Sequence, residues 1–390
     1  MNNFIYEIPT KIYFGENQLQ GNLSKEIEKY GTKVLLVYGG ESIKKIGLYE
    51  EVINEIRSSK IEIYEFSGIE PNPRHTKINE AVQICKEKDI DVILAVGGGS
   101  VIDSCKLICA GKYFDGDVWD LIIKKAKIEK ALPLITILTL SATGSEMNGT
   151  AVISNMETNE KKSVKTPLLL PKVSFLNPKV TYSVSKYQTA CGSADILSHI
   201  METYFARNSG LYMLDTVMEG LMKTVIKYAK IAYIEPENYE ARANLMWASS
   251  WAINGFARMD KEPNTWICHL LEHQLSAFYD ITHGLGLAIV TPRYLKYVLN
   301  KDTVDRYYQF GINVWGIDSN LPKMEVAKKS IEYLEEFLYK DLNLTDNLTD
   351  LNIDNSNFEE MANRICGNGK VEAFVDIRKV DVVKIFNACL

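Results

Sequence analysis

The stretch DVILAVGGGSVID, residues 91–103, decides the fold class of the chain. Residues 92–96 form an uninterrupted apolar run, and three consecutive glycines follow it directly. A run that is apolar at every position is typical of a strand buried on both faces of a parallel sheet. The residues after the glycines have helical spacing, so the stretch predicts a strand, a glycine turn and a helix in succession.

The neighbouring segments repeat this pattern. The stretches KVLLVYGG, KIEIYEF and LPLITILTL predict further strands, and LYEEVINEIRSSK and KINEAVQICKEKDI predict helices between them. Strands that alternate with helices favour a parallel sheet covered on both faces. After Lys186 long helical patterns dominate. The sequence therefore predicts an α/β domain over residues 1–185 and an all-α domain over residues 186–390.

Composition excludes several classes of partner. The chain has 390 residues, 46% of them hydrophobic and 24% charged, with a formal net charge of -6. Lysines are scattered among acidic residues, which argues against nucleic acid or an anionic membrane as the main partner. We find neither a secretory signal pattern nor an apolar run long enough for a membrane span, and the 7 cysteines form no CxxC pair. These features predict a cytoplasmic protein with reduced thiols.

Two glycine turns are candidates for binding phosphate. Gly39 and Gly40, with Ser42, follow one predicted strand, and Gly97–Ser100 follow another. Glycines at a strand end let backbone N–H groups approach a pyrophosphate, and the next helix points its positive end at the same place. Neither turn has the GxGxxG pattern, and each also fits a tight turn that simply needs glycine.

A hydroxyl-rich stretch, LTLSATGSEMN at residues 138–148, follows the last predicted strand of this domain. Thr139 and Thr143 suit contacts to a ribose or to the edge of an adenine. Thr143 equally suits the N-cap of the next turn, so both interpretations stay open.

Four of the five histidines fall on two helical segments and an adjoining glycine turn. Asp195 and His199 are four residues apart on one predicted helix, and His269 and His273 are four residues apart on another, so each pair shares a helix face. His283 follows ten residues after His273. Three nitrogens and one oxygen, from Asp195, His199, His269 and His283, suit Zn²⁺ or Fe²⁺ with a position open for substrate. Each residue alone is also compatible with a hydrogen-bonded role in a helical core.

Several motifs together resemble the iron-containing, or group III, alcohol dehydrogenases, in particular the branch of butanol dehydrogenases and NADPH-dependent aldehyde reductases. The motifs are IPTKIYFG, YGGESIKKIG, GIEPNPR, GGGSVIDSCK, LTLSATGSEMN, GSADILSH, HLLEHQLSAFYDITHGLGLAI and FGINVWGI. They extend from the first predicted strand to about residue 317.

The resemblance implies a dinucleotide-binding α/β domain, a helical metal-binding domain and an active site in the cleft between them. It implies that Asp195, His199, His269 and His283 bind one divalent metal, Fe²⁺ or Zn²⁺. It places the nicotinamide cofactor over Gly97, Gly98, Gly99 and Ser100, with Asn72, Asp103, Thr139, Thr143 and Lys161 also lining its site; Lys162 is the alternative to Lys161. His273 is then a candidate proton relay or a hydrogen-bonding residue beside the ligands. By analogy with the family, a homodimer is expected.

The choice between cofactors depends on the turn YGGESIKK. Ser42 is retained from the pattern of the NADPH-dependent branch, and Lys44 and Lys45 could contact a 2′-phosphate. Glu41 stands where that branch has a third glycine, and its carboxylate would repel a 2′-phosphate unless it turned to solvent. Between the two, the sequence favours NADP(H) over NAD(H).

The predicted function is a metal-dependent alcohol dehydrogenase, or aldehyde reductase, that interconverts short-chain primary alcohols such as butanol and their aldehydes by hydride transfer. One alternative is a lyase similar to dehydroquinate synthase, which would need basic residues clustered beside the metal motifs, and the sequence shows no such cluster. The other is a non-catalytic structural subunit, which predicts the loss of a ligand position, whereas all four candidates are present.

Overall fold

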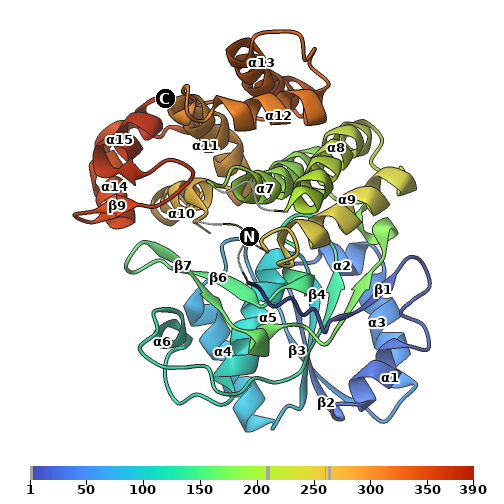
Figure 1. The fold of residues 1–390 in the computed structure, drawn as a ribbon. Coiled ribbons are helices and arrows are strands. Elements are labelled where there is room, and N and C mark those ends of the chain that lie inside the picture. The colour runs from blue at the N-terminus through green and yellow to red at the C-terminus, as the bar shows by residue number, and fades with distance from the viewer. Residues whose placement is uncertain (1–2, 208–210, 260, 262–264) are drawn as a thin grey trace. The chain divides into compact units, whose positions relative to one another are not determined.

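The computed structural model describes residues 3–207, 211–259, 261 and 265–390, which form two compact units. The sheet unit comprises Glu7–Val184 and Pro236–Asn254, and the helical unit comprises Met1–Tyr6, Ser185–Glu235 and Gly255–Leu390 (Figure 1). The sequence predicts a single boundary after residue 185, whereas the chain passes between these units at several points.

The sheet unit contains a six-stranded sheet in which all neighbouring strands are parallel. Its spatial order is β1 (Lys11–Phe14), β8 (Val173–Leu176), β5 (Leu134–Leu138), β4 (Val92–Gly97), β2 (Lys33–Tyr38) and β3 (Glu62–Phe66). The chain therefore builds outward from the β2–β4 pair in both directions, which makes this pair the topological switch point of the sheet.

Helices cover both faces of this sheet, which explains the uninterrupted apolar runs. Leu36 of β2 packs in one hydrophobic cluster with Val52, and the adjacent Leu35 packs in a second cluster with Ile78. Because successive strand residues point to opposite faces, both must be apolar when both faces are buried. The helices of this unit are α1 (Leu23–Glu28), α2 (Ser42–Lys45), α3 (Leu48–Arg57), α4 (His75–Glu87), α5 (Gly99–Gly111), α6 (Val118–Ile122) and α9 (Tyr239–Ile253). The predicted parallel α/β architecture is confirmed.

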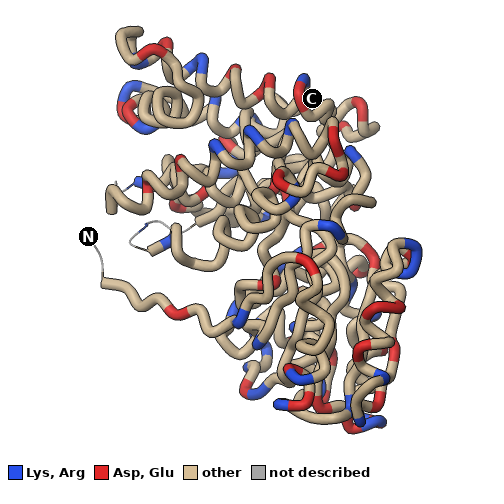
Figure 2. The backbone as a smooth tube through the Cα atoms, turned by 90° about the vertical axis from the view of Figure 1, so that its right-hand side faces the viewer, with Lys and Arg blue, Asp and Glu red and all other residues tan. Residues whose placement is uncertain are grey.

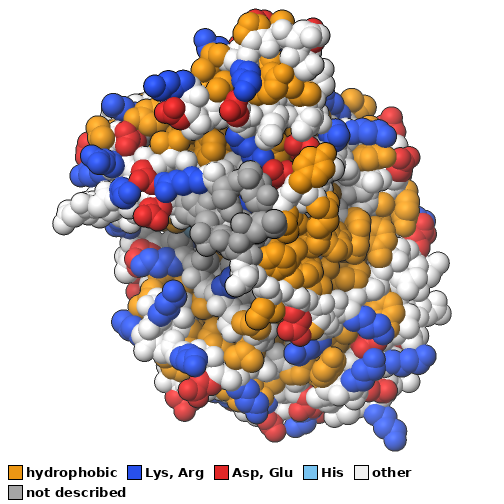
Figure 3. Space-filling view, viewed as in Figure 1, with side chains coloured by type: hydrophobic (Ala, Val, Ile, Leu, Met, Phe, Trp, Pro, Cys, Tyr) orange, Lys and Arg blue, Asp and Glu red, His pale blue; other side chains and the backbone are white. Residues whose placement is uncertain are grey.

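Two further elements complete the sheet unit. An antiparallel hairpin pairs β6 (Thr150–Asn155) with β7 (Glu160–Lys165). Trp247 of α9 packs edge-to-face on Phe14 of β1, with ring centroids 5.6 Å apart. These two rings line a surface groove of about 430 Å³, and hydrophobic side chains gather over α9 in Figure 3. This packing explains why α9 belongs to the sheet unit although it lies far along the chain.

The helical unit is built around α7, which packs against α8, α10 and α11. Its helices are α7 (Lys186–Tyr204), α8 (Tyr212–Ile234), α10 (Ile267–Tyr279), α11 (His283–Val298), α12 (Val304–Trp315), α13 (Lys323–Glu335), α14 (Phe358–Cys366) and α15 (Lys379–Asn387), and a short ladder joins β9 (Lys370–Val371) to β10 (Ile377–Arg378). In Figure 2 basic and acidic residues are intermingled along the outer helices. Within the described ranges, no helix combines the length and the apolar character that a membrane crossing requires.

Candidate metal centre and cofactor site

Helix α7 presents Asp195 and His199 on the same face, one helical turn apart. The Ser185 side chain caps this helix by accepting a hydrogen bond from the backbone N–H of Gln188 at 3.2 Å. Asp195 is 2% exposed and His199 is 3% exposed. A carboxylate buried to this degree requires compensation from its neighbours, because burying it unpaired is costly.

The second and third histidines reach Asp195 through a tight connection between α10 and α11. Helix α10, which carries His269, ends at Tyr279. Its C-cap residue Asp280 is in the left-handed region at φ 51°, and α11 begins at His283. A Cβ added at Gly284 would lie 2.0 Å from the backbone oxygen of Cys191 on α7. Only glycine lets α11 start this close to α7, and the close approach places His283 beside Asp195.

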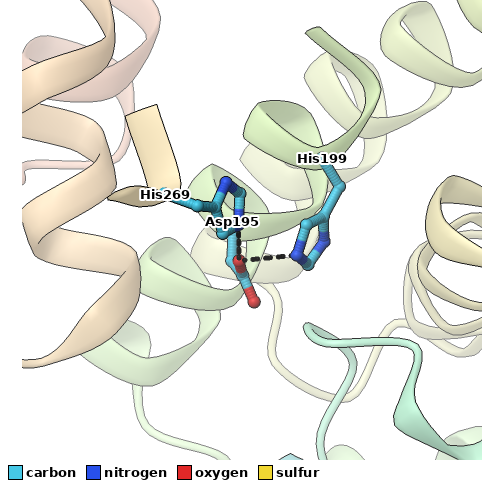
Figure 4. Close-up of side chains that lie close together, drawn as sticks. All are labelled: Asp195, His199 and His269. Atoms are coloured by element: carbon cyan, nitrogen blue, oxygen red, sulfur yellow. Dashed lines mark ion pairs between the residues drawn. The ribbon is translucent and has the colours of Figure 1, made fainter. Parts of the chain in front are cut away.

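Three imidazole nitrogens converge on one carboxylate oxygen. The Asp195 Oδ1 atom lies 3.3 Å from His199 Nε2, 3.8 Å from His269 Nε2 and 3.6 Å from His283 Nε2. Figure 4 shows Asp195 between His199 and His269, with the two histidines coming from different helices. In a tetrahedral site with metal–ligand bonds of about 2.1 Å, neighbouring ligand atoms lie about 3.4 Å apart. The three distances from Asp195 Oδ1 are close to this spacing, and the ligand atoms of Asp195, His199 and His269 all lie within 4.8 Å of one another. His283 is close to Asp195 but lies in a second group with Glu272 and His273.

The hydrogen-bonding state of these atoms supports the same interpretation. Asp195 Oδ1 and His269 Nε2 are buried and have no hydrogen-bond partner among the described residues. Buried polar atoms in proteins are otherwise nearly always bonded. Three nitrogens and a carboxylate oxygen are a donor set that Zn²⁺ and Fe²⁺ accept, and a bound cation would satisfy the unpartnered atoms.

The mutual proximity of these groups also changes their acidity. Burial alone would raise the pKa of Asp195, but the attraction of His199 and the other histidines holds it well below its usual value. Burial lowers the pKa of His199 to about 4. Burial acts in the same direction on His269, but its interactions with the carboxylates of Asp195 and Glu202 outweigh it and raise that pKa to about 9. The carboxylates thus strongly favour a positive charge at this point of the helical unit.

The structure places two buried carboxylates, Glu202 and Glu272, beside these histidines, and the sequence patterns did not predict either of them. Glu202 lies one turn beyond His199 on α7, and its Oε1 atom is 3.1 Å from His269 Nδ1. Glu272 of α10 accepts a hydrogen bond from His283 Nδ1. Their positions in the sequence offered a signal, since Glu202 is three residues from His199 and Glu272 is three residues from His269.

His273 lies beside the cluster rather than within it. Its ring centroid is 5.7 Å from that of His283 and 6.3 Å from that of His269. A ligand atom of His273 lies within 4.8 Å of ligand atoms of Glu272 and His283, and the residue is only partly buried. Asp195 has ion-pair contacts to the other three histidines of the helical unit.

In the sheet unit, the two glycine turns flank the topological switch point. Gly39 and Gly40 follow β2, Gly97 ends β4, and Gly98 is the N-cap of α5. A Cβ at Gly39 would lie 3.8 Å from Val101 of α5, so the two turns are neighbours. The N-cap of α5 is Gly98, which has no side chain to cap the helix, and the positive end of such a helix favours an anion. Ligands of open parallel sheets bind at such a point, so the turns fit a dinucleotide.

The hydroxyl-rich stretch packs directly on the second glycine turn. The Thr139 backbone N–H donates to the Gly97 oxygen at 3.1 Å, and a Cβ at Gly99 would lie only 2.3 Å from Thr143 Oγ1. Thr143 Oγ1 also accepts a hydrogen bond from the Ser145 N–H at 3.3 Å, but the N-cap of the short 3-10 helix that follows (Ser145–Met147) is Gly144. The structure thus brings Thr139 and Thr143 to the glycine turn.

Two charged candidates for the cofactor site are already bonded within the protein. Asp103 accepts hydrogen bonds from Ser145 Oγ at 2.5 Å and from the Val152 N–H at 2.8 Å, which joins α5 to β6. Lys161 of β7 is 7% exposed, and its Nζ donates to Asn72 Oδ1 at 3.0 Å. The adjacent Lys162 points the other way and forms an exposed ion pair with a neighbouring glutamate. Strand alternation therefore makes Lys161 the inward-facing lysine.

The turn that carries Glu41 is exposed. Glu41 is paired with Lys44 at 3.2 Å, and the Lys44 ammonium also lies 5.6 Å from the ring centroids of Tyr38 and Tyr49. Ser42 begins the short helix α2. Lys44 thus lies beside a carboxylate and two aromatic rings on an exposed turn.

A parallel-sheet unit with glycine turns at its switch point, joined to a helical unit with a three-histidine, one-aspartate cluster, defines a class of metal- and nicotinamide-dependent dehydrogenases. Family comparison agrees: the model of iron-containing alcohol dehydrogenases matches residues 9–178, and the model of the C-terminal part of the Fe-containing alcohol dehydrogenase family matches residues 189–390. The chain belongs to the iron-containing alcohol dehydrogenase family.

Individual relatives give more detail. The chain is 48% identical to the NADH-dependent butanol dehydrogenase A of Clostridium acetobutylicum over 388 residues. This alignment covers 99% of each chain. It is 33% identical to an NADPH-dependent aldehyde reductase of Escherichia coli, with 95% of each chain covered. The crystal structure of the NADH-dependent butanol dehydrogenase A of Thermotoga maritima superposes with a TM-score of 0.93 at 37% identity, covering 100% of this chain and 99% of the other.

Proposed function

We propose that this chain interconverts short-chain primary alcohols, such as butanol, and their aldehydes, using a nicotinamide cofactor and one divalent metal. The observation that carries the proposal is the convergence of three histidine Nε2 atoms on Asp195 Oδ1. Asp195, His199, His269 and His283 would hold the metal, and the turns at Gly39–Gly40 and Gly97–Ser100 would hold the cofactor. The names of the relatives support this class of reaction and do not favour the lyase or the structural subunit.

When bound, the metal supplies Lewis acidity at the carbonyl oxygen and the reduced nicotinamide supplies the hydride. The chain contributes position and charge. Asp195, which is buried, would supply the negative charge that holds the cation, and His199, His269 and His283 would supply the nitrogen ligands. The uncapped N-terminus of α5 attracts the cofactor pyrophosphate, while Asn72 and Lys161 provide polar contacts nearby.

His273 is proposed as the group that delivers a proton to the nascent alcohol oxygen. It lies beside His283, and its partial exposure gives it access to solvent protons. An imidazole can pass a proton near neutral pH because its pKa ordinarily lies in that range. A purely structural role as a hydrogen-bonding neighbour of the ligands is the alternative.

The variant His273→Gln separates these roles. We expect kcat for butyraldehyde reduction to fall about 100-fold, a typical contribution of general acid catalysis, while the bound metal stays at the wild-type level. Metal content measured by atomic emission and steady-state kinetics are the two readouts. Loss of metal together with activity would instead make His273 a ligand or a support of one, and unchanged kcat would exclude the relay.

For the cofactor we propose NAD(H), in place of the NADP(H) that the sequence alone favours. The Glu41 carboxylate lies at the turn after β2, where it would repel a 2′-phosphate. The Clostridium and Thermotoga relatives, both named NADH-dependent, support the same choice.

One assay tests the proposed function. Protein stripped of metal by a chelator should not reduce butyraldehyde, and reloading with Fe²⁺ or Zn²⁺ should restore activity. Run in parallel with NADH and NADPH, the reloaded enzyme should show the higher kcat/KM with NADH. A folded protein that turns over no short aldehyde with either metal would overturn the assignment, and a higher kcat/KM with NADPH would overturn the role of Glu41.

The cytoplasmic location remains a prediction from the sequence, and the homodimer remains an expectation from the resemblance to the family.

A further inference from the structure

Glu272 holds the imidazole of His283 from the side opposite Asp195. His283 Nδ1 donates to Glu272 Oε2, and Ser276 Oγ donates to the other oxygen, Glu272 Oε1. Glu272 is fully buried at 0% exposure, and a Cβ at Gly286 would lie 2.7 Å from its Cγ, so glycine makes room for it. Contacts with Ser276 and Gly286 therefore hold the Glu272 carboxylate in place independently of its hydrogen bond to His283.

Glu202 does the same for His269. Its Oε1 atom accepts a hydrogen bond from the His269 backbone N–H at 2.8 Å and lies 3.1 Å from His269 Nδ1. The Glu202 side chain is 4% exposed. One oxygen therefore fixes both the backbone and the ring of this histidine.

His199 differs from the other two histidines. Its Nδ1 atom is buried and has no hydrogen-bond partner among the described residues. Its ring stacks on that of His269, with centroids 4.8 Å apart and planes at 16°, and lies 5.2 Å from the ring of Trp266. On the Nδ1 side of this ring, aromatic packing takes the place of a carboxylate.

We infer that Glu202 and Glu272 are positioning residues that set the metal affinity of the centre through His269 and His283. A carboxylate that accepts from Nδ1–H selects the tautomer whose free Nε2 faces Asp195 and makes that nitrogen a better donor. The two carboxylates also add buried negative charge beside the histidines, which favours a cation. The inference rests on the proposed metal centre and adds two residues that act through its ligands.

The test compares Zn²⁺ affinity in isosteric variants, measured by competition with a chromophoric chelator on metal-free protein. Glu202→Gln and Glu272→Gln should each bind Zn²⁺ about 10- to 100-fold more weakly than the wild type. The matched control is Glu219→Gln, because Glu219 is also buried in the helical unit but accepts from Tyr204 Oη and Asn313 Nδ2 instead of a histidine. The control should bind Zn²⁺ within about twofold of the wild type.

Circular dichroism of the metal-free protein shows whether Glu272→Gln folds. If it does not fold, a second variant at the same position replaces it in the test. Glu272→Asp keeps the charge but withdraws the carboxylate by one methylene, so it too should weaken Zn²⁺ binding. Wild-type affinity in Glu202→Gln and in the folded Glu272 variants would overturn this inference alone. Absence of Zn²⁺ binding by the wild type would overturn both the inference and the proposed metal centre.

Discussion

Asp195→Asn should abolish tight metal binding and lower kcat/KM for butyraldehyde reduction by at least about 10³-fold, which corresponds to about 4 kcal/mol of transition-state stabilisation. Asparagine has nearly the shape of aspartate, so the surrounding packing is retained. It lacks the charge that draws three imidazoles to one oxygen at 3.3 to 3.8 Å. Metal content after dialysis and steady-state kinetics provide the measurements.

The matched control for this variant is Asp305→Asn. Asp305 lies on α12 of the same unit, with a side chain that is 75% exposed and paired with Lys323. Exposed ion pairs contribute little, so the control should keep its metal and its activity. Retention of a full complement of metal and activity in Asp195→Asn would refute the proposed ligand set.

Gly99→Ala is expected to have the second largest effect. The added Cβ would lie 2.3 Å from Thr143 Oγ1 and 2.9 Å from Thr143 Cβ. Rotation of the threonine relieves the first contact but not the second, so the N-terminus of α5 must move away from the 138–148 stretch. We expect NADH to bind at least about 100-fold more weakly and the free energy of unfolding to fall by about 1–3 kcal/mol.

NADH fluorescence titration and urea unfolding measure the two effects. Gly220→Ala serves as the control, because within the described part of the chain no heavy atom lies within 4 Å of its added Cβ, and alanine is the better helix former within α8. Unchanged NADH affinity in Gly99→Ala would show that the cofactor does not lie over this turn.

Local patterns in the sequence predicted the sheet unit well, because each strand is buried on both faces. Residues 92–96 are apolar throughout because β4 is buried on both faces, and the glycines that follow them mark the end of this strand. The same locality explains why Asp195 and His199 were recognised as one face of a helix. Four residues along one helix determine that relation without reference to any other part of the chain.

Contacts between segments that are far apart in the chain could not be predicted from local sequence patterns. The alternation of β7, once its pairing with β6 is known, distinguishes the inward Lys161 from the exposed Lys162. The membership of α9 in the sheet unit depends on the packing of Trp247 against Phe14, 233 positions earlier in the chain. Both depend on contacts that no local pattern encodes.

By itself the sequence determined the parallel α/β architecture, the helical second half and the candidate ligands, since strand burial and helical spacing are local properties. Only the tertiary structure showed that His269 and His283 lie beside Asp195. It also showed that Glu202 and Glu272 contact the Nδ1 atoms of these two histidines. The physical reason is a single close approach. The absence of a side chain at Gly284 lets α11 start against the backbone of α7 at Cys191, and that contact places residues more than 80 positions apart around one carboxylate oxygen.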